Sequence, residues 1–451
     1  MTPTDFEPEY SSYKDADGFV FYENNKVYRK INPSFLPKYE WLKSRGIYEN
    51  LLQQKLLIPF TEVLTNKGVC LETTIVPIIT YPYEWCFEQL KQAALLQLQL
   101  MDCCLKQGAI LKDATPFNIQ FYNNKACFID LLSIEPYEEG TPWNGYKQFC
   151  EMFLAPLILS AYLPGNWNKS LAVQLEGIPL KQAAAALPFK ASFNSLSLIH
   201  IISHSKFSSK GSSSQIKKIS KDKIFSILNH LKSGIEDLTA FDKKSNWTSY
   251  ENQMPYTAEE LQLKKQSVEN WLSGKQYDTV LDIGANHDVY AKLFHGKAKQ
   301  VIAIDNDSTV IDNLCKKSAD ITYSFIPLHI DITMVSPALG LNLKERKSFF
   351  ERVQPDMTIA LALVHHLFHS RNIPLDRMAE LFKTCSKDLI IEFISEEDEQ
   401  FQKIRNINNH LAYDKTSFEK AFSLYFSINS VVEIKAGKRY LYYMTLKQST
   451  V

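Results

Sequence analysis

Two short apolar segments in the second half of the chain, each with an acid at its end, constrain the fold more than any other feature. Residues 279–283 read Thr-Val-Leu-Asp-Ile and lead into Gly284, and residues 300–304 read Gln-Val-Ile-Ala-Ile and lead into Asp305. Apolar runs of this length are typical of parallel strands that are covered on both faces. They predict a βαβ unit with a tight turn at Gly284, where a ligand can approach a backbone that has no Cβ. An acid at the tip of the second strand can accept hydrogen bonds from both hydroxyls of a ribose.

The hexapeptide at 281–286, Leu-Asp-Ile-Gly-Ala-Asn, followed by Asp305, resembles motif I and the next acidic position of class I S-adenosylmethionine (SAM) methyltransferases. This resemblance implies an α/β fold, a Rossmann-like seven-stranded sheet with a reversed last strand, SAM as cofactor, and methyl transfer as the reaction. It places the methionine end of SAM near Gly284, the ribose on Asp305 and the adenine on Asp331. The residues that it assigns to the cofactor are Asp282, Gly284, Ala285, Asn286, Asp305, Asn306, Asp331, Ile332, Trp247 and Tyr256.

The chain departs from the family pattern just after the turn, where His287 and Asp288 replace two small residues. The negative charge of Asp288 would repel a pyrophosphate and tolerate the sulfonium and amino groups of SAM, which favours SAM over a dinucleotide. Two alternatives remain open: a βαβ turn that binds no ligand, and a domain that binds SAM or a related nucleotide without turnover.

Composition sets limits on the class of protein. A chain of 451 residues is too long for one ordinary core, so two or three domains are expected. Its 50 basic and 50 acidic residues cancel, so there is no strong signal for nucleic acid or for an anionic membrane. The chain contains no run of about 18 apolar residues that would span a bilayer. The N-terminal residues lack a secretory signal, and the eight cysteines form no Cys-x-x-Cys pair, so we expect a cytoplasmic protein with reduced thiols and no metal site.

The first half of the chain reads as an α+β domain. Residues 17–31 contain two β-rich runs around Glu-Asn-Asn-Lys and predict a hairpin. A helix is expected at 39–52, followed by strands at 56–63 and 70–79. Apolar residues then recur at helical spacing from 85 to 107, and Gly108 is the expected end of that long helix.

The segment after this helix resembles the catalytic segment of protein kinases and aminoglycoside phosphotransferases, because a loop Asp, an Asn five residues later and a further Asp follow one another. By that resemblance Asp113 takes the base position, Asn118 and Asp130 the metal positions, and Lys30 the phosphate-binding position, with Mg and ATP as ligands. The segment departs from the kinase pattern: no Gly-rich loop precedes Lys30, and Leu131 follows Asp130. Three readings stay open, namely an active phosphotransferase, a kinase-like binding lobe without transfer, and an unrelated strand-turn-strand.

These observations divide the chain into a kinase-like substrate or regulatory domain at 1–202, a Ser/Lys-rich connector and helix at 203–245, and a methyltransferase domain at 246–451. Helices are expected at 224–238 and 258–272. In many class I methyltransferases the segment before motif I folds over the cofactor. By that resemblance Trp247, Tyr250 and Tyr256 form an aromatic lid, and packing at the domain junction is the alternative.

The rest of the C-terminal domain continues the alternation of helix and strand: a helix at 308–317, a strand at 324–330 before Asp331, and an apolar strand at 357–364 that ends in His365 and His366. A histidine at a strand tip can serve as a general base, and we expect at most one of this pair to face the ligand. Later strands are expected at 387–393, 425–432 and 440–447, the last two as an antiparallel pair, and a helix at 416–422.

The sequence Asp331-Ile-Thr, the Pro-Ala-Leu-Gly that follows it and the His-His strand are similar to those of bacterial two-part proteins described as nodulation-associated methyltransferases, over nearly the full chain. The sequence therefore predicts a SAM-dependent methyltransferase with a kinase-like N-terminal lobe. Its expected partner is an unidentified methyl acceptor, either a small molecule or a protein.

Overall fold

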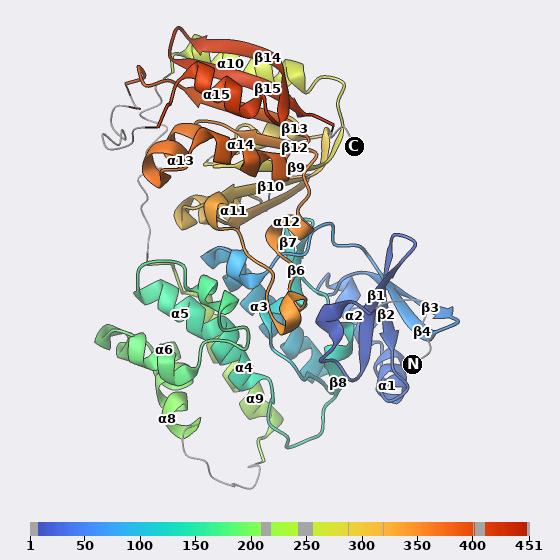
Figure 1. The fold of residues 1–451 in the computed structure, drawn as a ribbon. Coiled ribbons are helices and arrows are strands. Elements are labelled where there is room, and N and C mark those ends of the chain that lie inside the picture. Colours follow the sequence, from blue (N-terminus) through green and yellow to red (C-terminus); the bar gives the residue numbers. More distant parts are fainter. Residues whose placement is uncertain are drawn as a thin grey trace. The chain divides into compact units, whose positions relative to one another are not determined.

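The computed structural model describes residues 8–208, 218–241, 256–286, 288–318, 320–399, 401 and 411–448 (Figure 1). The chain forms two compact units. Unit 1 consists of Met1–Lys243 and Pro337–Lys347, and unit 2 of Lys244–Ser336 and Ser348–Val451. The chain therefore passes between the units three times. All eight cysteines are free thiols. In the described part of the chain, no helix combines the length and the apolar character needed to cross a membrane.

Unit 1 begins with a four-stranded antiparallel sheet in the order β1-β2-β4-β3. The strands are β1 (Gly18–Glu23), β2 (Lys26–Ile31), β3 (Phe60–Thr65) and β4 (Gly68–Thr73). The predicted hairpin is confirmed, and Asn24 and Asn25 both adopt positive φ in its two-residue turn, as a type I′ turn requires. The single helix predicted at 39–52 is two helices, α1 (Leu36–Ser44) and α2 (Ile47–Gln53), because Gly46 adopts the left-handed conformation between them.

The predicted long helix is α3 (Phe87–Lys106), and Gly108 at φ 80° ends it. Two small antiparallel pairs follow. They are β5 (Ala109–Leu111) with β8 (Ile134–Pro136), and β6 (Ile119–Tyr122) with β7 (Lys125–Phe128). The remaining α-helices of unit 1 are α4 (Tyr146–Phe149), α5 (Ala155–Tyr162), α6 (Leu180–Ala186), α7 (Ser195–Ser197), α8 (His204–Ser208) and α9 (Lys221–Glu236).

Helix α9, which lies within the predicted connector and helix at 203–245, belongs to unit 1. Its C-terminal end is held by Lys91 of α3, whose Nζ donates to the carbonyl oxygens of Glu236 (2.7 Å) and Leu238 (2.8 Å). The apolar face of α9 is buried along its length at Ile224, Leu228, Leu231 and Ile235.

Residues Pro337–Lys347, which we call the arm, lie between the third and fourth strands of unit 2 in the sequence and belong to unit 1 by their contacts. The arm closes on itself through two backbone hydrogen bonds between Leu339 and Arg346, at 2.9 and 3.0 Å. Leu339 packs against the apolar cluster of Tyr81, Tyr83 and Leu171. No feature of the sequence predicted that this segment, which interrupts unit 2 in the chain, would pack in unit 1.

Polar contacts fasten the arm within unit 1. The Lys347 amide donates to the hydroxyl of Tyr81 (3.0 Å), and the guanidinium of Arg346 lies 4.4 Å from the centre of the Phe117 ring. The carboxylate of Glu345 is nearly buried and lies 3.4 Å from Nζ of Lys14. The arm is therefore a packed part of unit 1.

Unit 2 contains a seven-stranded sheet in the order β11-β10-β9-β12-β13-β15-β14. The strands are β9 (Tyr277–Ile283), β10 (Ala298–Asp305), β11 (Ser324–His329), β12 (Met357–Ala360), β13 (Asp388–Ile394), β14 (Phe426–Lys435) and β15 (Arg439–Leu446). β15 is antiparallel to both of its neighbours, whereas the first five strands in this order are parallel. The predicted seven-stranded α/β sheet with a reversed last strand is confirmed.

The helices of unit 2 are α10 (Ala258–Trp271), α11 (Ser308–Ser318), α12 (Phe349–Arg352), α13 (Val364–Arg371), α14 (Leu375–Thr384) and α15 (Lys415–Phe422). Figure 1 shows α13, α14 and α15 in a row beside the sheet. The strands that form its centre, β9, β10 and β12, are almost entirely buried.

Two predictions for unit 2 were wrong. In the described part of the connection between β9 and β10, the expected helix is replaced by a 3-10 turn, Ala291–Phe294, and Gly296 at φ 71° follows it. The strand expected at 357–364 ends at Ala360, and Val364 opens α13. A run of apolar residues cannot by itself distinguish a buried strand from a buried helix.

Candidate functional site

A cavity of about 500 Å³ opens at the carboxyl ends of β9, β10, β11 and β12. β9 lies between β10 and β12, so the order of the strands reverses at this point, which is where ligands bind in open α/β sheets. The lining residues are Ile283, Gly284, Asn286, Ile304, Asp305, Asn306, Ile330, Asp331, Ile332, Leu361, Ala362, Leu363, His366, Leu367, Ser370 and Arg371. Six of the ten predicted cofactor residues are among them.

The turn after β9 forms one wall of the cavity. Gly284 has φ 73°, which a residue with a Cβ rarely adopts, and its amide donates to the carbonyl oxygen of Ile304 at 2.9 Å. Ala285 donates to the same oxygen at 3.2 Å and is buried outside the lining set. The Asn286 amide donates to Oδ2 of Asp305 (3.2 Å), which ties the turn to the tip of β10.

Asp305 is the acid that the cavity presents at the tip of β10. Its Oδ1 accepts the Asp307 amide at 2.9 Å, so backbone donors orient both carboxylate oxygens. Burial raises the pKa of Asp305 to about 6, above the ordinary value for an aspartate. The carboxylate is therefore mostly ionised at neutral pH and able to accept hydrogen bonds from vicinal hydroxyls.

Asp282 lies in β9, paired in register with Ala303 of β10 and Ile359 of β12, and is not among the lining residues. Burial, with a smaller contribution from the charge of Asp305, raises the pKa of Asp282 to about 7. The structure therefore places this acid behind the site rather than in contact with the cavity.

Asp331 and Ile332 border the cavity beyond β11. Asp331 accepts from the amide (2.9 Å) and the hydroxyl (2.6 Å) of Thr333 through Oδ1, which caps a 3-10 turn, and Arg371 donates to its Oδ2. Arg371, in the last turn of α13, was not predicted, since a lone arginine at a helix end gives no signal of its own. Asp331 and Arg371 form a charged pair at this edge of the cavity.

His365 and His366 occupy the first turn of α13 instead of a strand tip, which corrects the prediction. His366 lines the cavity, and burial lowers its pKa to about 4, so its imidazole is neutral near pH 7. His365 is buried outside the lining set, its ring 6.5 Å from that of Phe401, and burial holds its pKa well below the usual range. A base with a pKa near 4 is weak at neutral pH, so the role of general base is not favoured by this environment.

Tyr256 was predicted to form part of an aromatic lid over the cofactor, and the structure does not place it there. This side chain is outside the cavity lining and donates its hydroxyl to Oε1 of Glu392 at 2.6 Å. Trp247, Tyr250 and His287 lie outside the described residues. Asp288 is buried outside the cavity lining, and its carboxylate pairs with Nζ of Lys292 at 2.8 Å.

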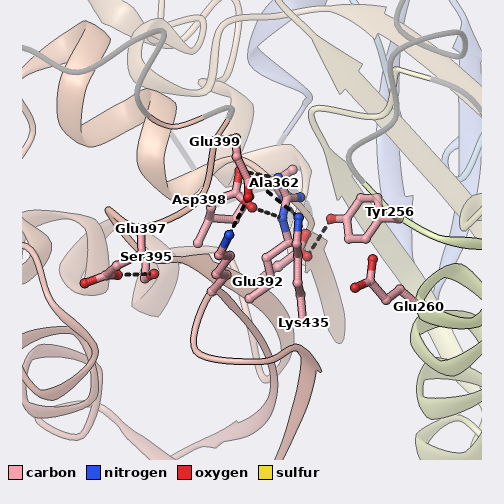
Figure 2. Close-up of polar contacts among 12 residues, drawn as sticks. Tyr256, Glu260, Ala362, Glu392, Ser395, Glu397, Asp398, Glu399 and Lys435 are labelled. Atoms are coloured by element: carbon pink, nitrogen blue, oxygen red, sulfur yellow. Dashed lines mark hydrogen bonds and ion pairs between the residues drawn. The ribbon is translucent and has the colours of Figure 1, made fainter.

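A buried charge network that the sequence reasoning missed adjoins the cavity (Figure 2). Glu392 in β13 is fully buried, and its Oε2 accepts from Nζ of Lys264 (2.8 Å) and from the amide of Ala362 (3.0 Å). Next to it, Arg439 donates twice to Asp398, at 2.7 and 2.9 Å. The only sequence signal was a single acid within the apolar strand Leu-Ile-Ile-Glu-Phe-Ile.

The candidate residues of unit 1 come together in part. Nδ2 of Asn118 donates to Oδ2 of Asp130 (3.0 Å), and burial, with the charge of Asp130, raises the pKa of Asp113. Arg29 lies beside Asp130, at 3.0 Å, whereas Lys30 is the residue predicted to bind phosphate. Lys30 is the next residue on the same strand and lies over the Phe19 ring, because adjacent strand residues point to opposite faces.

Arg29 also pairs with Asp15 (2.9 Å), and Lys112 pairs with Asp17. Positive and negative side chains thus neutralise one another across this part of unit 1. Among the residues that the structure describes, no group of three or more His, Cys, Asp or Glu side chains is placed to hold a metal ion. The kinase-like prediction for this unit remains a prediction.

The strand order of unit 2 and the cavity at its point of reversal define a Rossmann-like α/β protein of the methyltransferase type, joined to an α+β unit. The chain is 30% identical over 452 residues to nodulation protein NoeA of Rhizobium meliloti (strain 1021), covering 96% of this chain and 94% of that protein. The chain therefore belongs to the NoeA family. No protein-family model matches it.

Solved structures resemble part of the chain. The N-methyltransferase NodS from Bradyrhizobium japonicum WM9 is 12% identical, with a TM-score of 0.32, over 42% of this chain and 97% of its own. The bifunctional kinase-methyltransferase WbdD is 14% identical, with a TM-score of 0.31, over 44% and 41%. Magnesium protoporphyrin IX methyltransferase (ChlM) from Synechocystis PCC 6803 with bound SAM is 14% identical, with a TM-score of 0.29, over 46% and 86%.

Proposed function

We propose that unit 2 binds SAM in the cavity at the end of β9 and that the protein is a SAM-dependent methyltransferase. The observation that carries the proposal is the position of the Asp305 carboxylate in the lining, held by two backbone amides at the tip of the strand next to the Gly284 turn. In this arrangement Asp305 accepts the ribose hydroxyls, Gly284 gives the methionine part room beside the backbone, and Asp331 and Ile332 border the adenine.

The charges of the cavity favour SAM over a dinucleotide. Dinucleotide sites hold a pyrophosphate at the N-terminus of the helix after the first strand. In the described part of that connection the chain forms only the 3-10 turn Ala291–Phe294. Asp305 and Asp331 line the cavity, and Arg371, its only lining Lys or Arg among the described residues, is paired with Asp331. A cationic sulfonium and a free amino group fit such an environment better than two phosphates.

Methyl transfer requires no covalent catalysis by the protein, since the sulfonium already activates the methyl group. The main contribution is the alignment of acceptor, methyl carbon and sulfur. Neutral His366 in the lining can accept a hydrogen bond from the acceptor, although its low pKa makes it a weak base. We therefore expect an acceptor whose nucleophile is available without strong base catalysis, such as a neutral amine.

Within this proposal, unit 1 recognises the acceptor or regulates the reaction. Arg29 beside Asp130 supports a binding role, because a fixed cation already compensates the carboxylate that a divalent metal would need. The acceptor is a small molecule or a protein.

The proposal is tested by isothermal titration of the full chain with SAM and S-adenosylhomocysteine, followed by incubation with methyl-labelled SAM and a cell extract. We expect binding of both compounds, its loss in Asp305→Ala, and a labelled product that the variant does not form. No binding by the wild-type protein would refute the proposal.

The rival, a SAM-binding protein without turnover, is favoured by the low pKa of His366, because a lining histidine with a pKa of about 4 is a weak base at neutral pH. Binding of SAM with no labelled product in extracts that contain small molecules and proteins would support it over the methyltransferase.

A further inference from the structure

We propose that Glu392 is a positioning residue that acts through the backbone of Ala362 to hold the loop 361–363 in the shape that lines the cofactor cavity. This inference rests on the proposed SAM site. Glu392 is not among the lining residues, whereas all three loop residues are. Its effect on the cofactor therefore passes through the hydrogen bond from the Ala362 amide to Oε2 of Glu392.

The loop needs such support because its middle residue is strained. Ala362 has φ 51°, in the left-handed region, which is unfavourable for a residue with a Cβ. The loop directly follows β12, so a relaxed Ala362 would turn Leu361 and Leu363 away from the present wall. The hydrogen bond to Glu392 opposes that relaxation at the point where the strain lies.

The rest of the network fixes Glu392 in its place. Tyr256 donates to Oε1 (2.6 Å) and Lys264 donates to Oε2 (2.8 Å), so with the Ala362 amide three donors from two segments converge on one carboxylate. Burial alone would raise the pKa of Glu392, but the charges of Lys264 and Arg439 hold it below its usual range. The acid therefore stays ionised, and its oxygens have little freedom to turn from Ala362.

A second buried pair in the same network provides a matched control. The Arg439–Asp398 pair is as buried as the Lys264–Glu392 pair, and Glu392, not Asp398, accepts the hydrogen bond from the Ala362 amide. Breaking it should destabilise the fold to a similar extent and leave the Ala362 hydrogen bond in place.

Two conservative variants of the full chain distinguish a role of Glu392 in positioning the loop from a role in balancing the charge of Lys264. Glu392→Gln loses the charge but keeps an oxygen at the position that accepts from Ala362, and Tyr256 can turn its hydroxyl to accept from the new amide. Glu392→Asp keeps the charge near Lys264 but withdraws the oxygen by one methylene. The readouts are the Kd of SAM from titration calorimetry, thermal unfolding, and amide hydrogen exchange of the peptide that contains Ala362.

We expect Glu392→Asp to weaken SAM binding about tenfold and to speed exchange at Ala362, since the loop loses its anchor and relaxes. Glu392→Gln and the control Asp398→Asn should stay within about threefold of wild type despite a lower melting temperature. Adding Ala362→Gly to Glu392→Asp should recover part of the affinity, since glycine adopts positive φ without strain.

Equal losses in Glu392→Asp and Glu392→Gln, a larger loss in Glu392→Gln, or no loss in either would overturn the positioning role. A wild-type protein that fails to bind SAM would instead refute the proposed function, so the two failures are distinct. If Glu392→Asp does not fold, Ala362→Gly alone decides the question: exchange at Ala362 that matches the wild type would then contradict an anchored, strained loop.

Discussion

The Asn286 amide donates to Oδ2 of Asp305 across 3.2 Å, which joins the turn after β9 to the tip of β10 at the edge of the cavity. Asn286 reaches this position with φ 39°, one residue after the Gly284–Ala285 pair hydrogen-bonds to Ile304. The acid that would hold a ribose is thus oriented by the loop that would hold the rest of the cofactor. Changes at either residue should affect the same binding equilibrium.

The affinity for SAM should depend on the ionisation of Asp305. Burial raises its pKa to about 6. Protonation removes an acceptor for the ribose hydroxyls, so affinity should fall as the pH drops below about 6, approaching tenfold per pH unit. Calorimetric titration with SAM between about pH 5 and pH 8 measures this. Asp305→Asn should bind more weakly and show a nearly flat profile, and a steep profile in that variant would assign the titration to another group.

The stability of the ligand-free protein should respond to Asp282 in the opposite direction. Its folded-state pKa of about 7 lies above the unfolded value, so the stability that the neutral acid contributes is present at low pH and is lost as the pH rises through about 7. Asp282→Asn should raise the free energy of unfolding by about 1–3 kcal/mol more at pH 8 than at pH 5, because most of the penalty for ionising this acid in the folded state develops between those values. Urea unfolding at the two pH values checks this, and an equal effect at both would contradict it.

Alanine substitutions at two glycines with nearly the same φ would separate the effect of backbone strain from that of ligand contact. Gly284 has φ 73° and lines the cavity, whereas Gly274 has φ 72°, lies outside the lining and has nothing within 4 Å of an added Cβ. Alanine at either position should cost about 1 kcal/mol of stability. Only Gly284→Ala should weaken SAM binding, by about tenfold or more, because its Cβ enters the space of the ligand. Similar affinities for the two variants would show that the turn does not contact SAM.

Arg29 should be important for the stability of unit 1. Its side chain is 13% exposed and bridges Asp130 and Asp15, which are 14% and 22% exposed. Arg29→Met leaves both acids without this cation and should lower the free energy of unfolding by about 2–4 kcal/mol. Lys26, on the same strand as Arg29, forms a more exposed pair with Glu72 of β4, and Lys26→Met should change the stability much less than Arg29→Met. Thermal unfolding of the two variants gives the comparison.

The sheet of unit 2 was predictable because its strands are apolar runs with acids at their ends. Local pattern was sufficient for β9, β10 and the antiparallel pair of β14 and β15. The local pattern failed where every residue is apolar, because such a run does not show whether its period is that of a strand or of a helix. Val364 continues the apolar run of β12 and yet begins α13. The histidines that follow were therefore assigned to the wrong element, and only the structure shows that His366 alone of the pair lines the cavity.

The candidate residues that the sequence missed depend on contacts between distant segments. Arg29 and Lys30 are neighbouring cations on one strand, and nothing local indicates which of them faces Asp130. Glu392 acquires its role from Lys264, 128 residues away, and from the amide of Ala362. Charge complementarity in a buried network leaves no periodic pattern in the sequence, so the partners of these side chains could not be predicted from it.

The arm limits how the protein can be divided in the laboratory. A fragment that begins at Lys244 would carry Pro337–Lys347 without the aromatic surface of Tyr81 and Phe117 on which Leu339 and Arg346 pack. A fragment that ends at Lys243 would leave that surface bare to solvent. Domain-by-domain expression, the usual way to assign activities within a two-part protein, would therefore produce two damaged halves, and assignments of activity are better made with point variants in the intact chain.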